Sequence, residues 1–499
     1  MSATSDLFSK LLVQPDFFPR LPQQKRLYEV AKVSIHLGQL SAGSKLPSSR
    51  ELARDLGMAR NTVIAAFEQL MAEGYVTSAQ GSGTYVANLT ELKLAAQVMP
   101  APLASEVPGA ETTLLSRRGA HITAFGAGER FEIFPFVPAD DDFSSFPFKV
   151  WQRLQNRVWR DIHPDLLDYG RAGGYLPLRQ AIAEYVAASR SVKATAHNIL
   201  ITSGTQQSLD LCAQLLADVG DTAWVEDPCY WGARRVFEAC DLNLHPITVD
   251  GEGMALKPAD LACDPRLIYV TPSHQYPTGA IMSLARRREL LDVAVRKNAW
   301  ILEDDYDSEF RYTGRPLASL QGLDKDERVV YLGTFSKVLY PGIKVGYMVV
   351  PAALADAFKS ALYDLQRPGQ LMVQAALADF ISLGHFATHI RKIRQIYGSR
   401  RELLRKTLAG EFGSQLNQQV RISHEESGLH LLIEVPDHVD DVALEKLAAE
   451  SGIEVRALSA YYLSLPVRRG LLVGYAYVTP DKIVYYGKIL ASVIQSGLS

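Results

Sequence analysis

Short apolar runs alternate with helical patterns along residues 131–499, and this alternation limits how the chain can fold more than any other feature. Runs typical of buried strands occur at 198–202, 267–271, 300–303 and 329–332. Helical patterns at 151–159 and 180–189 lie ahead of the first run. Strands that alternate with helices favour a mostly parallel sheet covered by helices. We therefore expect residues 131–499 to form a large α/β domain.

The last of these runs delivers a lysine, Lys337, into a turn with several hydroxyl groups. Thr334 and Ser336 precede it, and Lys344 follows after a Pro341-Gly342 corner. A lysine can attach a phosphorylated aldehyde as a Schiff base, while hydroxyls and a second cation can hold the phosphate. Taken alone, Ser-Lys more often marks a surface lysine in a polar turn. The preference for a cofactor site therefore depends on the motifs upstream.

Three upstream motifs supply the other groups that such a cofactor needs. Ser203-Gly204-Thr205 stands between a strand and a helix, where backbone N–H groups bind phosphate, although such turns are often simple helix caps. Tyr230 can stack on a flat heterocycle, or it can belong to core or rim packing. Asp304 can pair with a pyridine nitrogen, and Tyr306 can donate to the phenolic oxygen of the same ring. Together these motifs favour a site for pyridoxal 5'-phosphate.

The carboxylates around Asp304 leave one alternative, a divalent metal. We give it less weight because a lysine and phosphate-binding cations compete for the same place. His274 has no partner in an HExxH or HxxH pattern, and we interpret it as a hydrogen-bonded loop residue. No metal site is therefore predicted.

Residues 1–88 carry the pattern of a small winged helix-turn-helix. A first helix ends near residue 38, a second begins with a capping box at residues 48–51, and a third begins near residue 60. A Gly-rich hairpin follows at 75–87. Helices and hairpins of this kind contact bases and phosphates of DNA. The candidate DNA-binding residues are Ser48, Arg50, Arg60, Asn61, Thr62 and Gly83.

Residues 89–130 are rich in Pro, Ala, Ser, Gly and Thr and show little periodicity, so we interpret them as an interdomain linker. The net charge of −3 gives no global field for nucleic acid. The four cysteines are scattered, which fits a reducing cytoplasm better than a disulfide framework. The first ten residues lack the features of a signal peptide, and no apolar run reaches membrane-spanning length. We expect a cytoplasmic protein with no membrane partner.

The motifs together resemble one family closely. KLPSSRELARDLGMARNTVIAAFEQLMAEGYV followed by GSGTYV resembles the GntR winged helix, with Ala59 where a capping serine is common. The later segments resemble fold-type I aminotransferases in the right order. TPSHQYPTG, EDDYDSEFRY and GTFSK are signatures of the MocR/GabR family, which fuses these two domains. The resemblance implies a regulator that binds pyridoxal phosphate and double-stranded promoter DNA, as a head-to-tail homodimer.

The resemblance also implies roles for single residues. Lys337 matches the lysine of the internal aldimine, Asp304 the partner of the pyridine nitrogen, and Tyr306 the partner of the phenolic oxygen. Tyr230 matches the stacking aromatic, and Tyr169 matches a tyrosine that reaches the phosphate of the neighbouring subunit. The implied phosphate cup consists of Ser203, Gly204, Thr205, Thr334, Ser336 and Lys344.

The chain departs from the aminotransferase pattern where a substrate carboxylate is held. Leu472 occupies the place of the usual arginine near the C-terminal strand, and Gly232 and Ala460 occupy two further arginine places. Tyr276 replaces an asparagine, as is usual in this family, and Lys344 replaces an arginine that binds phosphate in a bidentate way. Other arginines remain candidates for a carboxylate clamp, namely Arg234, Arg235, Arg456, Arg468 and Arg469.

These departures leave several functional hypotheses open. We expect a regulator that binds pyridoxal phosphate but is not tuned to a small ω-amino acid, and that acts on vitamin B6 or amino-compound metabolism. Its effector is either the cofactor itself or an amine that forms an external aldimine. The alternative is a working aminotransferase with a fused DNA-binding domain. A third possibility is a DNA-binding protein with a vestigial cofactor pocket.

Overall fold

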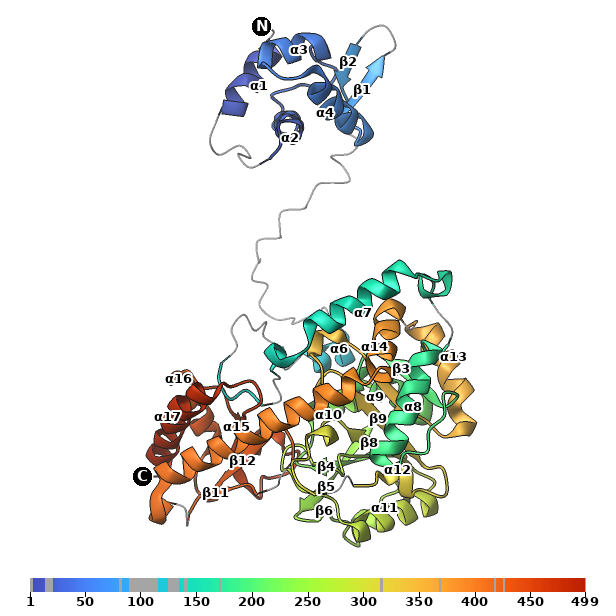
Figure 1. Ribbon diagram of the computed structural model, residues 1–499, viewed down its shortest axis with the longest axis vertical. Coiled ribbons are helices and arrows are strands. Elements are labelled where there is room, and N and C mark those ends of the chain that lie inside the picture. The colour runs from blue at the N-terminus through green and yellow to red at the C-terminus, as the bar shows by residue number, and fades with distance from the viewer. Residues whose placement is uncertain are drawn as a thin grey trace, which may run out of the picture. The chain divides into compact units, whose positions relative to one another are not determined.

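The protein consists of two compact units, residues 1–112 and 113–499, in a computed structural model (Figure 1). The structure describes residues 3–13, 21–79, 83–88, 115–123, 134–138, 142–169, 172–314, 317–367, 369–416, 419–424 and 427–498. The expected combination of a winged helix and a fold-type I α/β domain is confirmed. Each unit has its own hydrophobic core.

Among the residues that the structure describes, the first unit contains four helices and a two-stranded hairpin. Its elements are α1 (Ala3–Val13), α2 (Gln23–His36), α3 (Ser49–Leu56), α4 (Arg60–Ala72), β1 (Val76–Ala79) and β2 (Gly83–Val86). The last three helices and the hairpin were expected, whereas α1 was not. It packs on α2 and α3, and Phe8 belongs to the shared core. The segment before α3 also joins the hairpin, because Lys45 forms a bridge to Tyr85.

The caps in this unit follow from the sequence. The Ser48 hydroxyl accepts a hydrogen bond from the Glu51 amide at 3.2 Å and so begins α3. Gly57 ends that helix with a φ of 64°, in the left-handed region that favours glycine. Ala59 stands at the N-cap of α4 and provides no side-chain cap.

The second unit is built on an eight-stranded sheet in the order β3-β10-β9-β8-β7-β4-β5-β6. Neighbouring strands from β9 to β5 are parallel, and β10 runs antiparallel to both β3 and β9. The strands are β3 (Ile199–Thr202), β4 (Thr222–Asp227), β5 (Asn243–Asp250), β6 (Gly253–Met254), β7 (Leu267–Val270), β8 (Trp300–Asp305), β9 (Val329–Thr334) and β10 (Gly346–Val349). The mostly parallel sheet was expected, and the reversed strand β10 was not.

Helices cover both faces of this sheet. Leu200, Val225, Leu302 and Leu332 pack on one side with α9, α10 and α13. The other face packs against α7, α8 and α14 near β3 and against α11 near β7 and β8. The bounds of these helices are α7 (Phe148–Arg160), α8 (Leu176–Arg190), α9 (Thr205–Leu216), α10 (Trp231–Ala239), α11 (Leu284–Arg296), α12 (Leu320–Leu323), α13 (Ala355–Leu365) and α14 (Leu371–Ser382).

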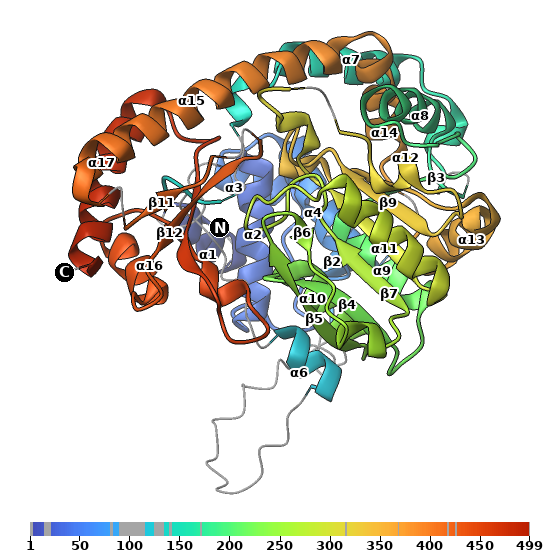
Figure 2. The same cartoon turned by 90° about the horizontal axis from the view of Figure 1, so that it is seen from below.

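A smaller antiparallel sheet completes the unit, in the order β11-β12-β14-β13. Figure 2 shows α15 extending from beside α14 to α17, at the side of this small sheet. The elements are α15 (His385–Leu416), β11 (Arg421–Ile422), β12 (His430–Val435), α16 (Asp441–Glu450), β13 (Arg456–Ala457), β14 (Arg469–Gly474) and α17 (Pro480–Leu498). Within the described ranges, no single helix is long and apolar enough to cross a membrane. Among the described helices, only α14 and α15 taken together have the length and composition of a membrane span, and they are bent by 76° relative to each other.

Most of the predicted linker lies outside the described residues, but residues 115–123 are described and contain a short helix. α6 (Arg117–Thr123) packs on α10, and Arg118 forms an ion pair with Asp241 at 2.8 Å. This part of residues 89–130 therefore belongs to the second unit. This helix could not be predicted from hydrophobic periodicity, because it is short and contains Gly119.

Candidate functional site

The sheet register brings three predicted motifs together at one edge of the sheet, where β3 and β9 end and β10 begins. Gly346 at the start of β10 stands opposite Thr202 at the end of β3 and opposite Thr334 at the end of β9. Since β10 runs antiparallel to both neighbours, the chain leaves β3 and β9 at the edge where it enters β10. Ser203-Gly204-Thr205, Ser336-Lys337 and Lys344 therefore gather there from segments that are far apart in the sequence.

Two glycines bring the backbone of this edge into close contact. A Cβ atom on Gly346 would lie 2.7 Å from the Cα atom of Gly204. Gly204 is the N-cap of α9, has a φ of 130° and provides no side-chain cap. The first amides of α9 therefore point to the edge where Thr334, Ser336 and Lys344 lie, which is an arrangement suited to phosphate. The Ser203 amide already donates to the Gln207 side chain at 2.6 Å.

Asp304 lies at the end of β8, the next strand in the sheet after β9. Its Oδ2 atom accepts a hydrogen bond from the Tyr269 hydroxyl at 2.8 Å. Its Oδ1 atom is buried, and no donor reaches it from the part of the chain that the structure describes. Burial, with the nearby charges of Asp305 and Asp307, raises the pKa of Asp304 to about 7, against the Tyr269 hydrogen bond. A buried acceptor of this kind fits a protonated ring nitrogen.

Tyr306 and Asp307, which follow β8, are hydrogen-bonded to His274 in the loop after β7. The Nδ1 atom of His274 lies 3.0 Å from the Tyr306 hydroxyl and 2.8 Å from Oδ2 of Asp307. His274 is therefore the hydrogen-bonded loop residue that the sequence indicated. Burial raises the pKa of Tyr306 well above its usual value, so its hydroxyl keeps its proton at neutral pH.

The remaining carboxylate of the group, Asp305, is held by an arginine. Arg190 contacts Asp305 through Nε at 2.7 Å and Nη2 at 3.1 Å, and the Tyr331 hydroxyl also donates to it. Asp304, Asp305 and Asp307 thus each contact different side chains of the protein. The described residues contain no group of three His, Cys, Asp or Glu side chains placed to hold a metal ion.

Tyr230 links the starts of two helices. It is the N-cap of α10, and its hydroxyl accepts a hydrogen bond from Nε2 of Gln206 in the first turn of α9 at 3.2 Å. A Cβ atom on Gly232 would collide with Gln206 and with the Tyr230 ring. The glycine at this predicted arginine place therefore leaves room for the link. Gln206 was not singled out from the sequence, because nothing in its neighbourhood in the chain points to Tyr230.

Three more of the predicted cofactor residues differ in how exposed they are. Lys337 is half-buried in the turn after β9. Tyr169 is 56% exposed, and the guanidinium carbon of Arg367 lies 4.5 Å from its ring centroid. Lys344 is exposed and has a φ of 50°, which places an unusual left-handed residue two positions before the start of β10. Leu472 is buried in β14.

In the first unit, the predicted DNA-binding side chains lie at the starts of α3 and α4. Arg50, Arg60 and Asn61 are exposed, while Ser48 uses its oxygen as the cap of α3. Gly83 begins β2, and a Cβ atom there would lie 2.7 Å from the Cε atom of Lys45. Lys45 therefore stands beside the hairpin, where no local sequence pattern could place it, because the bridge to Tyr85 joins distant segments.

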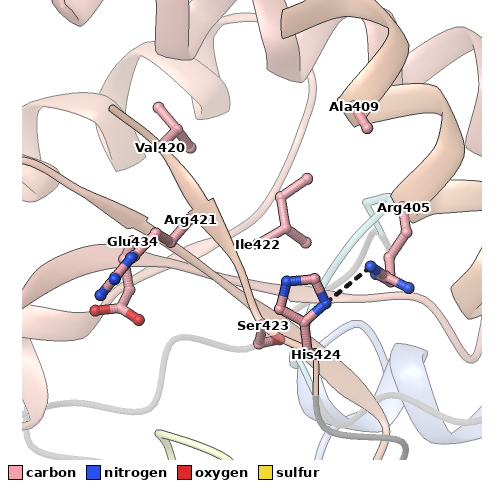
Figure 3. Close-up of a pocket in the computed structure, with 8 residues that line it drawn as sticks. All are labelled: Arg405, Ala409, Val420, Arg421, Ile422, Ser423, His424 and Glu434. Atoms are coloured by element: carbon pink, nitrogen blue, oxygen red, sulfur yellow. Dashed lines mark hydrogen bonds between the residues drawn. The ribbon is translucent and has the colours of Figure 1, made fainter. Parts of the chain in front are cut away.

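A separate cavity of about 470 Å³ lies between α15 and β11, away from all of these residues (Figure 3). Figure 3 shows Arg405 and His424 directed toward each other, at 3.0 Å between Nη2 and Nδ1. Arg421 and Glu434 lie at the other side, and Glu434 is paired with Arg468 at 2.9 Å. This cavity contains none of the predicted cofactor residues.

Comparison with known proteins supports the reading of both units. Residues 23–86 match the model of bacterial regulatory proteins of the gntR family, and residues 139–485 match that of aminotransferase class I and II. The chain is 38% identical over 461 residues to the probable rhizopine catabolism regulatory protein MocR of Rhizobium meliloti, covering 92% of this chain and 91% of that protein. It is 30% identical over 450 residues to the pyridoxine biosynthesis transcriptional regulator PdxR of Corynebacterium glutamicum, covering 90% and 91%.

Among solved structures, the second unit is similar to the kynurenine aminotransferase of Pyrococcus horikoshii, solved in complex with PMP. The identity is 27% and the TM-score 0.67, covering 74% of this chain and 92% of that one. The two units thus define a transcriptional regulator in which a DNA-binding winged helix is fused to an aminotransferase-like domain. This chain belongs to the MocR/GabR family of such regulators.

Proposed function

We propose that the second unit binds pyridoxal phosphate, and that the occupancy of this site, or its reaction with an amine, controls how the winged helix binds promoter DNA. The aminotransferase class I and II fold implies this cofactor. The observation that carries the proposal is the buried Oδ1 atom of Asp304, which lacks a donor among the described residues and lies beside the strand that leads to Lys337.

Each chain segment at this edge has a role in the proposal. Lys337 attaches the cofactor, which supplies an aldehyde that reacts reversibly with primary amines. The first amides of α9 bind the phosphate together with Thr334, Ser336 and Lys344. Asp304 accepts a hydrogen bond from the ring nitrogen, Tyr306 donates to the phenolic oxygen, and Tyr230 lies against the ring.

Absorbance spectroscopy tests the attachment. The purified protein is expected to carry a visible absorbance band that Lys337→Ala abolishes and that the surface substitution Lys325→Ala leaves unchanged. A protein without such a band after incubation with pyridoxal phosphate would favour the vestigial-pocket hypothesis.

A gel-shift titration on the DNA upstream of the coding sequence tests the control of DNA binding. Cofactor-free protein and protein with added pyridoxal phosphate should differ in affinity or footprint if the cofactor is itself the signal. If cofactor binds without changing the footprint, the signal is an amine, and amines are then added to the loaded protein. Arg60→Ala should weaken operator binding by about 1–3 kcal/mol without changing cofactor absorbance.

The alternative function is catalytic. The similarity to the Pyrococcus horikoshii kynurenine aminotransferase favours it, since that protein acts on an amino acid. Leu472 argues against it, because the substrate of an aminotransferase must be oriented by its carboxylate. Loss of the cofactor band during incubation with a panel of amino acids, accompanied by release of oxo acid, would support the enzyme.

The assembly we propose is a head-to-tail homodimer. Tyr169 carries this proposal, because it matches a tyrosine that reaches the phosphate of the neighbouring subunit and it is 56% exposed in the single chain. Light scattering on the purified protein should give twice the chain mass of 55.1 kDa. If the dimer places Tyr169 at the partner's phosphate, Tyr169→Phe should weaken cofactor retention without dissociating the dimer.

A further inference from the structure

Four tyrosines from separate parts of the chain, Tyr230, Tyr276, Tyr306 and Tyr461, form a wall centred on Tyr276. The Tyr276 ring lies 5.8 Å from Tyr230, 5.9 Å from Tyr306 and 5.5 Å from Tyr461, measured between centroids. The planes cross at 88°, 88° and 76°, which are edge-to-face arrangements. Because this wall contains both Tyr230 and Tyr306, it borders the place where an amine would meet the cofactor.

The wall has no net charge at neutral pH. Burial raises the pKa of Tyr230 to about 12 and that of Tyr276 and Tyr306 well above the usual value. The Tyr276 and Tyr461 hydroxyls lie 3.1 Å apart and share a hydrogen bond. His430 lies 5.4 Å from Tyr276, and burial lowers its pKa to about 3, so its ring is neutral. The wall therefore consists of aromatic rings and hydroxyls, with Tyr230 and Tyr306 half-buried and Tyr276 and Tyr461 buried.

Leucines fill the space behind the wall. Leu432, Leu458 and Leu472 pack with Tyr276 and Tyr461 in one buried cluster. Leu472 is the residue at the place of the usual carboxylate-binding arginine, and it is fully buried. A carboxylate brought against this cluster would lose its water without gaining a cation from Leu472.

The arginines that remained candidates for a clamp are already engaged. Arg234 pairs with Glu238 at 2.9 Å, and Arg468 pairs with Glu434 at 2.9 Å. Arg469 pairs with Asp441 at 3.4 Å.

The last two candidates are engaged as well. Arg456, whose β13 position stands opposite Leu472, contacts Glu445 at 3.1 Å and Glu454 at 2.5 Å. Arg235 stacks on Trp231 with 4.7 Å between its guanidinium carbon and the ring centroid. A ligand carboxylate would therefore compete with a carboxylate or a ring of the protein for each of these arginines.

From these contacts we infer that the amine recognised at this site carries no carboxylate: it is a primary amine whose neutral body, aromatic or hydroxyl-bearing, lies against the tyrosine wall. This inference rests on the proposed cofactor binding through Lys337. It adds the chemical class of the effector, which the family membership leaves open.

Matched pairs of compounds test the inference, each pair consisting of an amine and the same amine with an α-carboxylate. We would titrate the cofactor-loaded full-length protein with tyramine and tyrosine, phenethylamine and phenylalanine, and ethanolamine and serine, following the Lys337-dependent absorbance band. In at least one pair the amine should shift the band at a concentration at least tenfold lower than its amino acid. If the amino acid acts at an equal or lower concentration in every pair, or if no amine shifts the band, the inference is wrong.

The control separates this inference from the function on which it rests. The band is measured before any amine is added, so its absence refutes cofactor binding and removes both claims. A band that responds preferentially to amino acids refutes only the effector class.

Leu472→Arg should reverse the preference by at least tenfold, while the uncharged Leu472→Met should keep it. The measurement on the unsubstituted protein decides the matter even if the buried arginine prevents folding.

Discussion

The buried carboxyl group of Asp304 should make the cofactor-free protein less stable as the pH rises. Its pKa is raised from 3.8 to about 7, chiefly by burial. At about 1.36 kcal/mol per unit, the folded protein opposes ionisation of this group by about 4 kcal/mol. The folded state therefore holds a proton that the unfolded state releases above pH 4 or so, and the free energy of unfolding falls with rising pH until about pH 7.

The substitution Asp304→Asn removes this proton and therefore this dependence. Between pH 5 and pH 8 the unsubstituted protein should lose about 2–3 kcal/mol more than the variant, as an order of magnitude from the linkage relation. Glu303 and Glu309, whose pKa values are raised by burial and by Asp305, are present in both proteins and cancel in the difference. Glu226 cancels only in part, because the charge of Asp304 helps to raise its pKa. The variant should therefore be the more stable protein at pH 8, although it binds pyridoxal phosphate more weakly.

Urea unfolding followed by tryptophan fluorescence measures this effect in the full chain. All five tryptophans lie in the second unit, so the signal does not mix in unfolding of the winged helix. Lys337→Ala is the matched control, because it removes the attachment point and leaves Asp304, so it should keep the pH dependence. Parallel stability curves for the Asp304→Asn and unsubstituted proteins would refute the claim that Asp304 is held partly protonated.

Three further predictions concern the local contacts. Ser48→Ala should destabilise α3 by about 1 kcal/mol, and Ala59→Ser should stabilise α4 by a similar amount or less. Hydrogen exchange of the two helices measures both effects, and exchange equal to that of the unsubstituted protein would contradict the cap assignments. Arg118→Ala should increase amide exchange in α6 only a few-fold, since an exposed ion pair contributes little to stability; a complete loss of protection would mean that the ion pair alone holds the helix. Gly346→Ala should weaken cofactor binding at least tenfold because its Cβ would press on α9, whereas Gly342→Ala, whose Cβ would meet only Tyr340 at 3.8 Å, should not.

The sequence predicted those parts of the fold that are encoded by local patterns. The buried strands before Ser203 and Asp304 each appeared as short apolar runs, and the capping box at Ser48 marked the start of α3. These features depend on residues within a few positions of one another, so they can be recognised without the rest of the chain. The family signatures then gave the order of the two domains.

The parts that were missed depend on contacts between distant segments. The reversed strand β10 gives no local sign of its direction, yet it places Lys344 beside the start of α9. Tyr276 and Tyr461 share a hydrogen bond across 185 residues. The short helix α6 has little intrinsic stability and is formed where it packs on α10. Such features are decided by tertiary packing.

The docking of α6 changes the reach of the DNA-binding unit. Because α6 packs on α10, the stretch between the described parts of the two units runs from residue 89 to residue 114, which is shorter than the predicted linker of residues 89–130. Fully extended, this stretch reaches at most about 95 Å at 3.3–3.6 Å per residue, where the whole predicted linker would allow about 145 Å. If the proposed homodimer forms, a shorter linker raises the local concentration of each winged helix around its own subunit. The length of the linker would then limit how far apart two DNA sites bound by one such dimer can lie.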